Sequence, residues 1–172
     1  MSLNEIKSDL DKAREFAAVG NWAGVDQILQ SSKEKFNKDD VREIYKILSQ
    51  KMIEKCENDV QKIDESKFSW EYAGVIEMVE EAMEYAKKAE AKIPKLSEKT
   101  IRVMKLVYDR FIILDLTKAE NYKERKDKSL AMSYAKMAKE ILERAKLLNS
   151  YSSEEIRKRE KDIDNIIVEI DR

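Results

Sequence analysis

The sequence predicts an all-α protein of about seven antiparallel helices, and three observations support this class. Only three glycines and one proline interrupt the 172 residues, so the chain has few helix breakers. Apolar residues make up 42% of the chain and charged residues 40%, enough both to bury a core and to solvate the outside of long helices. The apolar residues recur at helical spacing, and no stretch alternates with period two. We expect a single domain over residues 1–172, made of three helical hairpins and a C-terminal capping helix.

The helix expected at the centre of the domain runs from Ile101 to Tyr122. Its apolar residues lie on most of its sides, so neighbouring helices must cover it on most sides. Charged residues interrupt it too often for it to cross a bilayer. The apolar positions are Ile101, Val103, Met104, Leu106, Val107, Tyr108, Phe111, Ile113, Leu114, Leu116 and Tyr122.

The first hairpin is expected at about 3–36. Ser2 and Glu5 have the spacing of a capping box at its start. Gly20 suits the left-handed turn that follows many helices, and Asn21 can cap the next helix. Because the joint between the two helices is so short, the pair must be antiparallel.

The second hairpin is expected at about 39–93. Its first helix is long and begins after Asn37 or Asp39. Its second helix follows a polar joint at 64–69. Proline disfavours helical geometry in the residue before it, so Pro94 is expected to end this helix at Ile93.

The third hairpin, at about 98–149, contains the central helix, which Ser97 caps. We expect its charged tail, Lys118 to Lys128, to fray into a loop, and Ser129 to cap the next helix. The capping helix, 153–171, opens with a Ser152/Glu155 capping box. Its narrow isoleucine stripe and charged back are typical of a helix that closes a stack.

The composition excludes several kinds of chemistry. The chain has no histidine, which removes the usual general base and the usual zinc or iron ligand. Cys56 is the one cysteine and shares a stripe with apolar residues, so it is expected in the core and not as a nucleophile. We expect no enzymatic activity, no cofactor and no metal. We also expect a cytoplasmic protein that has no signal peptide and binds neither membranes nor nucleic acids.

The first hairpin carries a resemblance to a known family. The residues that carry it are Ala13, Phe16, Gly20-Asn21-Trp22, Val25 and Leu29. They stand where the tetratricopeptide family has, in this order, a small residue, an aromatic residue, a Gly-Asp-Tyr turn, an alanine and a second aromatic residue. The likeness is best over Asp9 to Ser32. The second hairpin keeps only Tyr72, Val75, Val79 and Ala82, and the hairpin spacing departs from the family's period of about 34 residues. The resemblance implies stacked helical hairpins that bind other proteins.

A fainter likeness is to the 14-3-3 proteins, which are also built of antiparallel helices. It rests on residues 25–45 and on the run Tyr108-Asp109-Arg110-Phe111. In that family an arginine and a tyrosine of an inner helix help to hold phosphopeptides. The chain is shorter than that family's, and the family's basic triad is incomplete here.

The central helix supplies one group of candidate binding residues, which are Arg102, Lys105, Asp109 and Arg110. They either line a groove for an acidic or phosphorylated peptide or form an ion-paired strip, and such strips are commoner than binding sites. Asp115 lies between two leucines and needs a partner if it is buried. Lys118, one turn later, can supply a local pair.

Two further groups have alternative interpretations. Glu77, Glu80, Glu81 and Glu84 form an acidic ridge that binds a cation or a basic partner, or is simply a solvated face in which Glu84 pairs with Lys88. Four aromatic residues at two helix starts are either exposed anchors for a partner or fill the space between hairpins, which is the commoner role. They are Trp22, Phe68, Trp70 and Tyr72.

These observations favour a non-enzymatic protein-interaction module of the helical-repeat type, whose partner is a protein or peptide. A self-assembling helical bundle is the alternative, and a binder of phosphopeptides or acidic ligands is a further one. The self-assembly hypothesis rests on the isoleucine stripe of the last helix and on a charge asymmetry. Acidic residues are in excess before Pro94 and basic residues after it.

Overall fold

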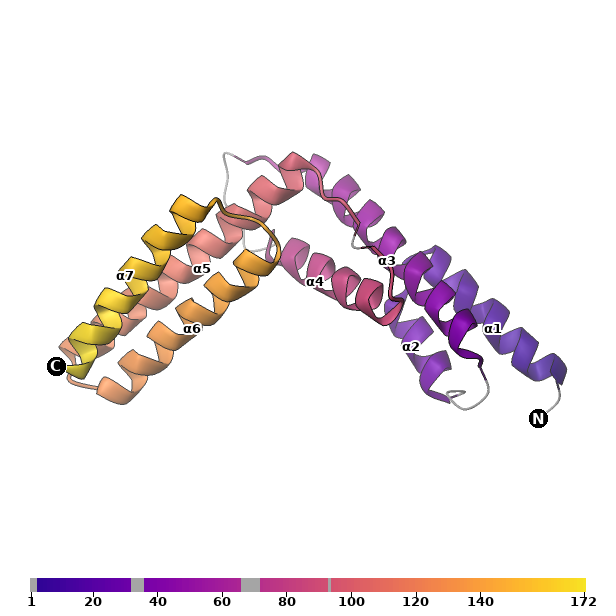
Figure 1. The fold of residues 1–172 in the computed structure, drawn as a ribbon, viewed down its shortest axis with the longest axis horizontal. Helices are drawn as coiled ribbons and strands as arrows, with labels where there is room; N and C mark the ends of the chain where they lie inside the picture. The colour runs from indigo at the N-terminus through magenta and orange to yellow at the C-terminus, as the bar shows by residue number, and fades with distance from the viewer. Residues whose placement is uncertain (1–2, 32–35, 66–71, 93) are drawn as a thin grey trace. The chain divides into compact units, whose positions relative to one another are not determined.

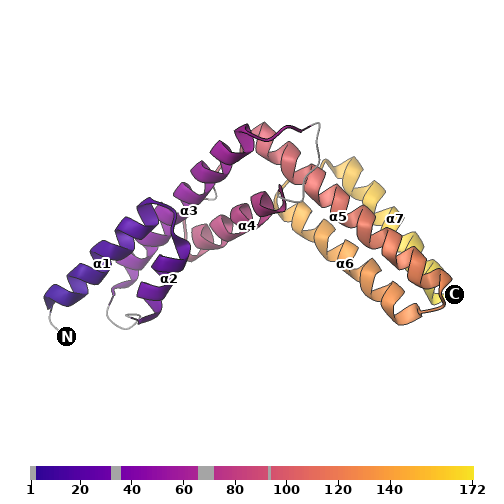
Figure 2. The same ribbon diagram turned by 180° about the vertical axis from the view of Figure 1, so that it is seen from behind.

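The computed structural model describes residues 3–31, 36–65, 72–92 and 94–172. These residues form helices and no strand, which confirms the all-α prediction (Figures 1 and 2). The helices are α1 (Leu3–Ala18), α2 (Trp22–Ser31), α3 (Lys38–Gln61), α4 (Ala73–Lys88), α5 (Glu98–Glu124), α6 (Lys128–Leu147) and α7 (Ser153–Asp171). None of the described helices is long and apolar enough to span a membrane.

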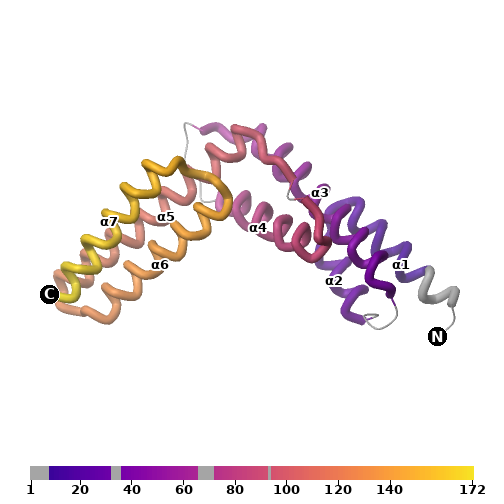
Figure 3. Tube along the Cα trace, viewed as in Figure 1, coloured from indigo at the N-terminus to yellow at the C-terminus, as the bar shows by residue number. Residues whose placement is uncertain are grey.

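The chain divides into two compact units (Figure 3). Unit 1 comprises the described residues of 1–64 and 74–100, and unit 2 those of 65–73 and 101–172. The expected single domain stays a prediction, and each unit is described by itself below.

Unit 1 contains α1 to α4. Helix α1 packs against both α2 and α3. Its core contains the apolar stripes of all four helices, including Ala13, Ala17, Val25, Leu29, Ile44, Leu48, Met52, Val60, Val75, Val79 and Ala82. Cys56 is buried among them, as its spacing predicts, and burial raises the pKa of its thiol to about 12. A thiol so rarely ionised at neutral pH is a packing residue and not a nucleophile.

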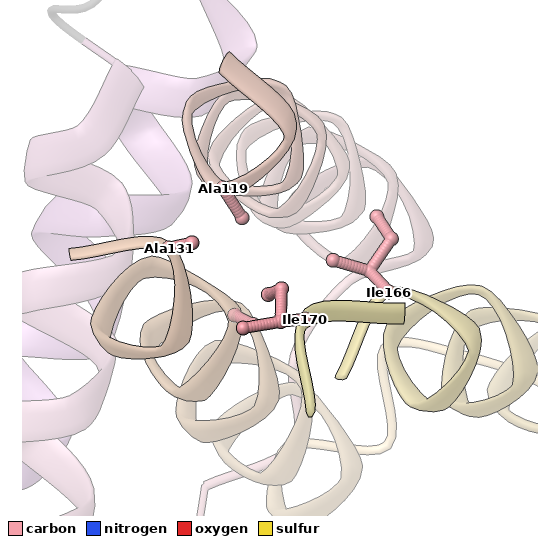
Figure 4. Close-up of a cluster of buried hydrophobic side chains, with 5 residues drawn as sticks. Ala119, Ala131, Ile166 and Ile170 are labelled. Atoms are coloured by element: carbon pink, nitrogen blue, oxygen red, sulfur yellow. The ribbon is translucent and has the colours of Figure 1, made fainter. Parts of the chain in front are cut away.

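Unit 2 is built around α5, α6 and α7. Small alanines of α6 allow its neighbours to approach closely, and isoleucines of α7 fill the space between them. Figure 4 shows one cluster, in which Ala119 of α5, Ala131 of α6, and Ile166 and Ile170 of α7 point toward one another. A second cluster joins Ile112, Ala138, Leu142 and Ile163. Of the predicted isoleucine stripe of α7, Ile163 and Ile170 are buried inside unit 2, and Ile156 and Ile167 are partly buried.

Helix α5 is covered less completely than expected. Val103, Met104, Val107 and Ile112 are fully buried, but Leu106 and Ile113 are exposed. These two residues are seven positions apart and so lie on one side of the helix. The prediction that neighbours cover both apolar sets of this helix is wrong for that side.

Most predicted helix starts are correct. Asn37 caps α3, with its Oδ1 accepting a hydrogen bond from the Asp40 N–H at 2.8 Å. Ser152 and Glu155 form the expected capping box of α7. The Ser97 hydroxyl accepts from the Thr100 N–H at 3.2 Å at the start of α5. The Ser2/Glu5 capping box lies partly outside the described residues.

Two boundaries around the α5–α6 joint were predicted wrongly. Asp127, not Ser129, caps α6 and accepts from the Leu130 N–H. The tail of α5 does not fray, since the helix continues to Glu124. The ring of Tyr122 stacks on that of Tyr134 in α6 at 5.5 Å, and these contacts hold the charged tail in helical form.

Four of the helix ends share one backbone feature. The residue with left-handed backbone conformation that follows each of α1, α4, α5 and α6 is Gly20, Glu90, Lys126 and Asn149, respectively. At the end of α4 the Glu90 N–H donates to the Lys87 carbonyl and the Ala91 N–H to the Ala86 carbonyl, both at 2.9 Å, which is a Schellman motif. Helix α4 therefore ends at Lys88, and the prediction that Pro94 ends it at Ile93 is wrong.

Candidate functional site

The charged residues predicted as a binding strip on α5 are engaged within unit 2. Lys105 forms an ion pair with Glu155 of α7, and its ammonium group lies 5.7 Å from the ring centre of Tyr151. Together with the cap at Ser152, this pair lowers the pKa of Glu155 to about 2. Lys105 is therefore engaged at the start of α7.

Asp109 is the centre of a second contact between α5 and α7. Its Oδ1 accepts hydrogen bonds from the Tyr151 hydroxyl at 3.0 Å and from Arg159 Nη2 at 2.6 Å and Nε at 3.0 Å. The side chains of Arg159 and Asp109 are 23% and 26% exposed. Burial, together with the Asp109 carboxylate, raises the pKa of Tyr151, so the phenol stays protonated and donates. The network ties the joint before α7 to α5.

The other two residues of the strip are more exposed. Arg102 lies 3.2 Å from Glu65, with its side chain more than half exposed. Arg110 is exposed and also has an interaction partner. The ion-paired interpretation thus describes Arg102, Lys105 and Asp109, and nothing in the geometry favours a groove for an acidic peptide on this helix.

Asp115 is buried, with 6% of its surface exposed. It lies on α5 between Ile112 and Ala119, which belong to the two core clusters of unit 2. Burial raises the pKa of its carboxyl group, and the charge of Lys118 acts in the opposite direction. No contact ion pair joins the two among the described residues, because the Lys118 ammonium group lies over the Tyr134 ring, 5.0 Å from its centre. Asp115 and Lys118 therefore attract each other at longer range and do not form the predicted contact pair.

The acidic ridge of α4 does not form a metal site. No group of three or more potential metal ligands is present in the described part of the chain. Glu84 pairs with Lys87 at 2.6 Å, and not with Lys88 as predicted. The Lys88 ammonium group instead lies 4.7 Å from the ring centre of Tyr85, where a cation is attracted to the aromatic face.

The aromatic residues at the two helix starts differ in what the structure shows. Trp22 is 47% exposed, so it is not the buried packing residue that the commoner role implies. Tyr72 is partly buried. Phe68 and Trp70 lie outside the described residues.

Trp22 belongs to an exposed apolar tip at the α1–α2 joint, defined by Phe16, Val19 and Trp22. Val19 is 73% exposed, and Phe16 is also exposed. Gly20 makes the left-handed turn between the helices, with a φ of 70°. A Cβ atom at Gly24 would lie 2.5 Å from the Phe16 ring, so only glycine lets that ring approach α2 here. The backbone thus holds the tip in place.

Sequence reasoning missed a polar link between α2 and α4. The Tyr85 hydroxyl donates to Asp26 at 2.8 Å, and the Tyr85 ring stacks on Tyr45 of α3 at 5.4 Å. Burial and the Asp26 carboxylate raise the pKa of Tyr85. The sequence separation between these residues left no local signal that could have predicted the link.

Unit 1 also contains an open cavity of about 370 Å³ that no sequence pattern indicated. It lies between the middle of α3 and the segment that follows α4. Its lining residues are Lys46, Ser49, Gln50, Ala89, Glu90, Ala91 and Lys92.

The described residues define an all-α protein. Comparison of the chain with protein-family models, with curated proteins and with solved structures finds no match.

Proposed function

We propose that the protein is a non-enzymatic interaction module whose apolar tip docks onto an apolar helix face of a partner protein. The observation that carries the proposal is the exposure of Trp22 together with Val19 and Phe16. Tryptophan is among the residues that most often dominate binding energy at protein interfaces.

The charge distribution around the tip indicates what kind of partner it suits. The chain is 40% charged, yet the stretch from Phe16 to Val25 has no charged residue. In the folded unit, Val19 lines an open hollow together with Lys51, Glu54, Lys55 and Asp59 of α3, so charged side chains border the tip on that side. A partner helix face that is apolar at its centre and polar at its edge suits this surface.

The energy available from the tip is sufficient for specific but reversible binding. A tryptophan side chain about half exposed offers on the order of 100 Å² of apolar surface. Burial of this area is worth about 2.5 kcal/mol at 25 cal/mol per Å². Val19, most of which is exposed, and Phe16 add to this amount.

The arrangement of the helices supports the hairpin-repeat interpretation. The first helices of two successive hairpins, α1 and α3, pack together. Their second helices are joined by the hydrogen bond from Tyr85 of α4 to Asp26 of α2. In stacked tetratricopeptide-like hairpins, the first helix of one hairpin lies beside the first helix of the next, and the second helices lie beside each other in the same way.

The two alternative functions receive less support. Self-assembly through the isoleucine stripe of α7 is less favoured, because Ile163 and Ile170 are buried in unit 2 and Ile156 and Ile167 are partly buried. Binding of an acidic or phosphorylated peptide at α5 has lost Lys105, which pairs with Glu155. The apolar tip is one of the apolar surfaces that stay exposed in the described part of the chain, and it is the one that contains a tryptophan.

Affinity capture with matched variants tests the proposal. Trp22→Lys should abolish retention of the partner, and Val19→Lys should weaken it strongly, because each places a charge in the apolar contact. Leu147→Lys is the control, since Leu147 is 79% exposed and belongs to unit 2, whereas the tip belongs to unit 1. A partner retained equally by the Trp22 and Leu147 variants would refute the assignment. Light scattering of the purified wild type distinguishes a second copy of the chain as the occupant.

A further inference from the structure

Asp115 places a carboxyl group on the packed side of α5. Only 6% of its surface is exposed, and Ile112 and Ala119, which lie one turn before and one turn after it on the same side of the helix, are fully buried. Ile112 and Ala119 belong to the two core clusters of unit 2. Asp115 is therefore part of the surface on which α5 packs against its neighbours.

The two clusters offer no group that could bond to a carboxylate. The buried residues that α6 and α7 contribute to them have aliphatic side chains, which neither donate hydrogen bonds nor carry charge. They are Ala131, Ala135, Ala138, Leu142, Ile163, Ile166 and Ile170. A charge in such surroundings is costly unless an opposite charge or a donor reaches it.

The charged groups of the three helices do not reach Asp115 in contact. Its neighbour Lys118 is drawn to the ring of Tyr134, which faces α5 from α6 and also stacks on Tyr122. The charge of Lys118 lowers the pKa of Asp115 from a distance, but burial has the larger effect, so this pKa lies above its ordinary value of 3.8.

The ion pairs that link the three helices are made at other positions. They are Lys105–Glu155, Asp109–Arg159 and Lys123–Glu169 between α5 and α7, and Lys139–Asp164 and Lys146–Glu160 between α6 and α7. The contrast with Asp109 is direct, because that carboxylate accepts three hydrogen bonds. Helix α5 thus carries one carboxylate that fastens unit 2 and one that has no contact partner among the described residues.

From this geometry we infer that Asp115 makes the packing of unit 2 sensitive to pH: α5, α6 and α7 pack most stably in mildly acidic solution, where the carboxyl group is neutral, and open more readily at neutral pH, where it is charged. The sign follows from linkage. The folded unit holds this proton up to a higher pH than the unfolded chain does, so the advantage is complete in acid and is lost as the pH rises through the folded pKa. The inference goes beyond the docking role of the apolar tip and does not depend on it.

Hydrogen exchange of buried amides tests this device in the full chain. The wild type and Asp115→Asn are compared at the amides of Ala119, Ala135 and Ala138, always at the same pH, so that the intrinsic pH dependence of exchange cancels. At neutral pH these amides should exchange about fivefold more slowly in the variant, because a neutral amide of the same shape replaces an unpaired charge. The difference should close as the pH falls toward 3.8. Equal or faster exchange of the variant at neutral pH, or a difference that persists in acid, would overturn the inference.

A direct titration and a matched variant separate Asp115 from the other carboxylates. The carboxyl-carbon chemical shift of Asp115 in the wild type should report protonation at a pH above 3.8. The control is Asp164→Asn, which removes the same charge from an exposed position on α7. It should change exchange of the same amides by less than about twofold at any pH, because water screens an exposed charge. Protonation of Asp115 at or below its ordinary value, or slowing by Asp164→Asn equal to that by Asp115→Asn, would refute the assignment.

Discussion

Replacement of Asp109 by alanine should destabilise unit 2 by about 2 kcal/mol. Asp109 Oδ1 accepts three hydrogen bonds, two of them from the Arg159 guanidinium. Removing one partner of a fully buried ion pair costs about 3–5 kcal/mol, and a hydrogen bond to a charged group is worth about 1.5–3 kcal/mol. Both side chains are about one quarter exposed, so water replaces part of what is lost. The lower part of these ranges therefore applies.

Urea unfolding followed by circular dichroism measures this loss. In a protein of this size, about 2 kcal/mol corresponds to a fall in melting temperature of about 4–8 °C. Hydrogen exchange should become faster in α7, because the lost bonds hold the start of that helix to α5. Asp164→Ala is the matched control, since Asp164 is exposed and lies 3.6 Å from Lys139. It should change the free energy of unfolding by less than about 0.5 kcal/mol.

A double-mutant cycle tells whether the loss comes from the network itself. Asp109→Ala and Arg159→Met should each destabilise, and the double variant should be less destabilised than their sum by about 1–2 kcal/mol. A loss below about 0.5 kcal/mol in Asp109→Ala, or strict additivity in the cycle, would refute the view that this contact fastens α7.

Three further predictions concern pH dependence, backbone conformation and thiol reactivity. The folded-state pKa of Glu155 is depressed to about 2, so its stabilising contribution is present above the unfolded value near 4.5 and is lost as the pH falls toward 2. In Glu155→Gln the free energy of unfolding, measured in urea, should therefore depend less on pH over that window. An unchanged pH dependence would contradict this. Lys126→Gly should raise the free energy of unfolding by about 1 kcal/mol, because glycine adopts the left-handed conformation at this position without strain. Glu90→Gly should raise it by less, because the ion pair with Arg42 is lost. Equal increases of the two variants in urea unfolding would contradict this. Cys56 should resist thiol reagents until the protein unfolds, and rapid labelling of the native state would contradict its burial.

The helices could be predicted because their signals are local. Helical spacing located every helix, and short-range capping located the starts at Asn37 and Ser152. The boundaries that failed depended on something else. Helix α4 stops early because Glu90 adopts a left-handed conformation that composition does not favour, and α5 continues because Tyr122 stacks on a residue of the next helix.

The roles of the charged residues could be predicted only in part. Spacing showed that Arg102, Lys105 and Asp109 share a face, but not that α7 would lie against it. The partners of Lys105 and Asp109 are Glu155 and Arg159, each 50 residues away in the sequence. Rotation of one helix against another depends on the packing of the whole unit, which no local pattern contains. For the same reason the sequence left open whether Trp22 would be exposed or packed.

Photo-crosslinking from position 22 tests the proposed function most directly. A photoreactive phenylalanine analogue in place of Trp22 should crosslink to an apolar helix face of one partner protein, and the same analogue in place of Leu147 should not. Crosslinks from both positions to the same proteins, or from neither position to any protein, would contradict a docking role for the apolar tip.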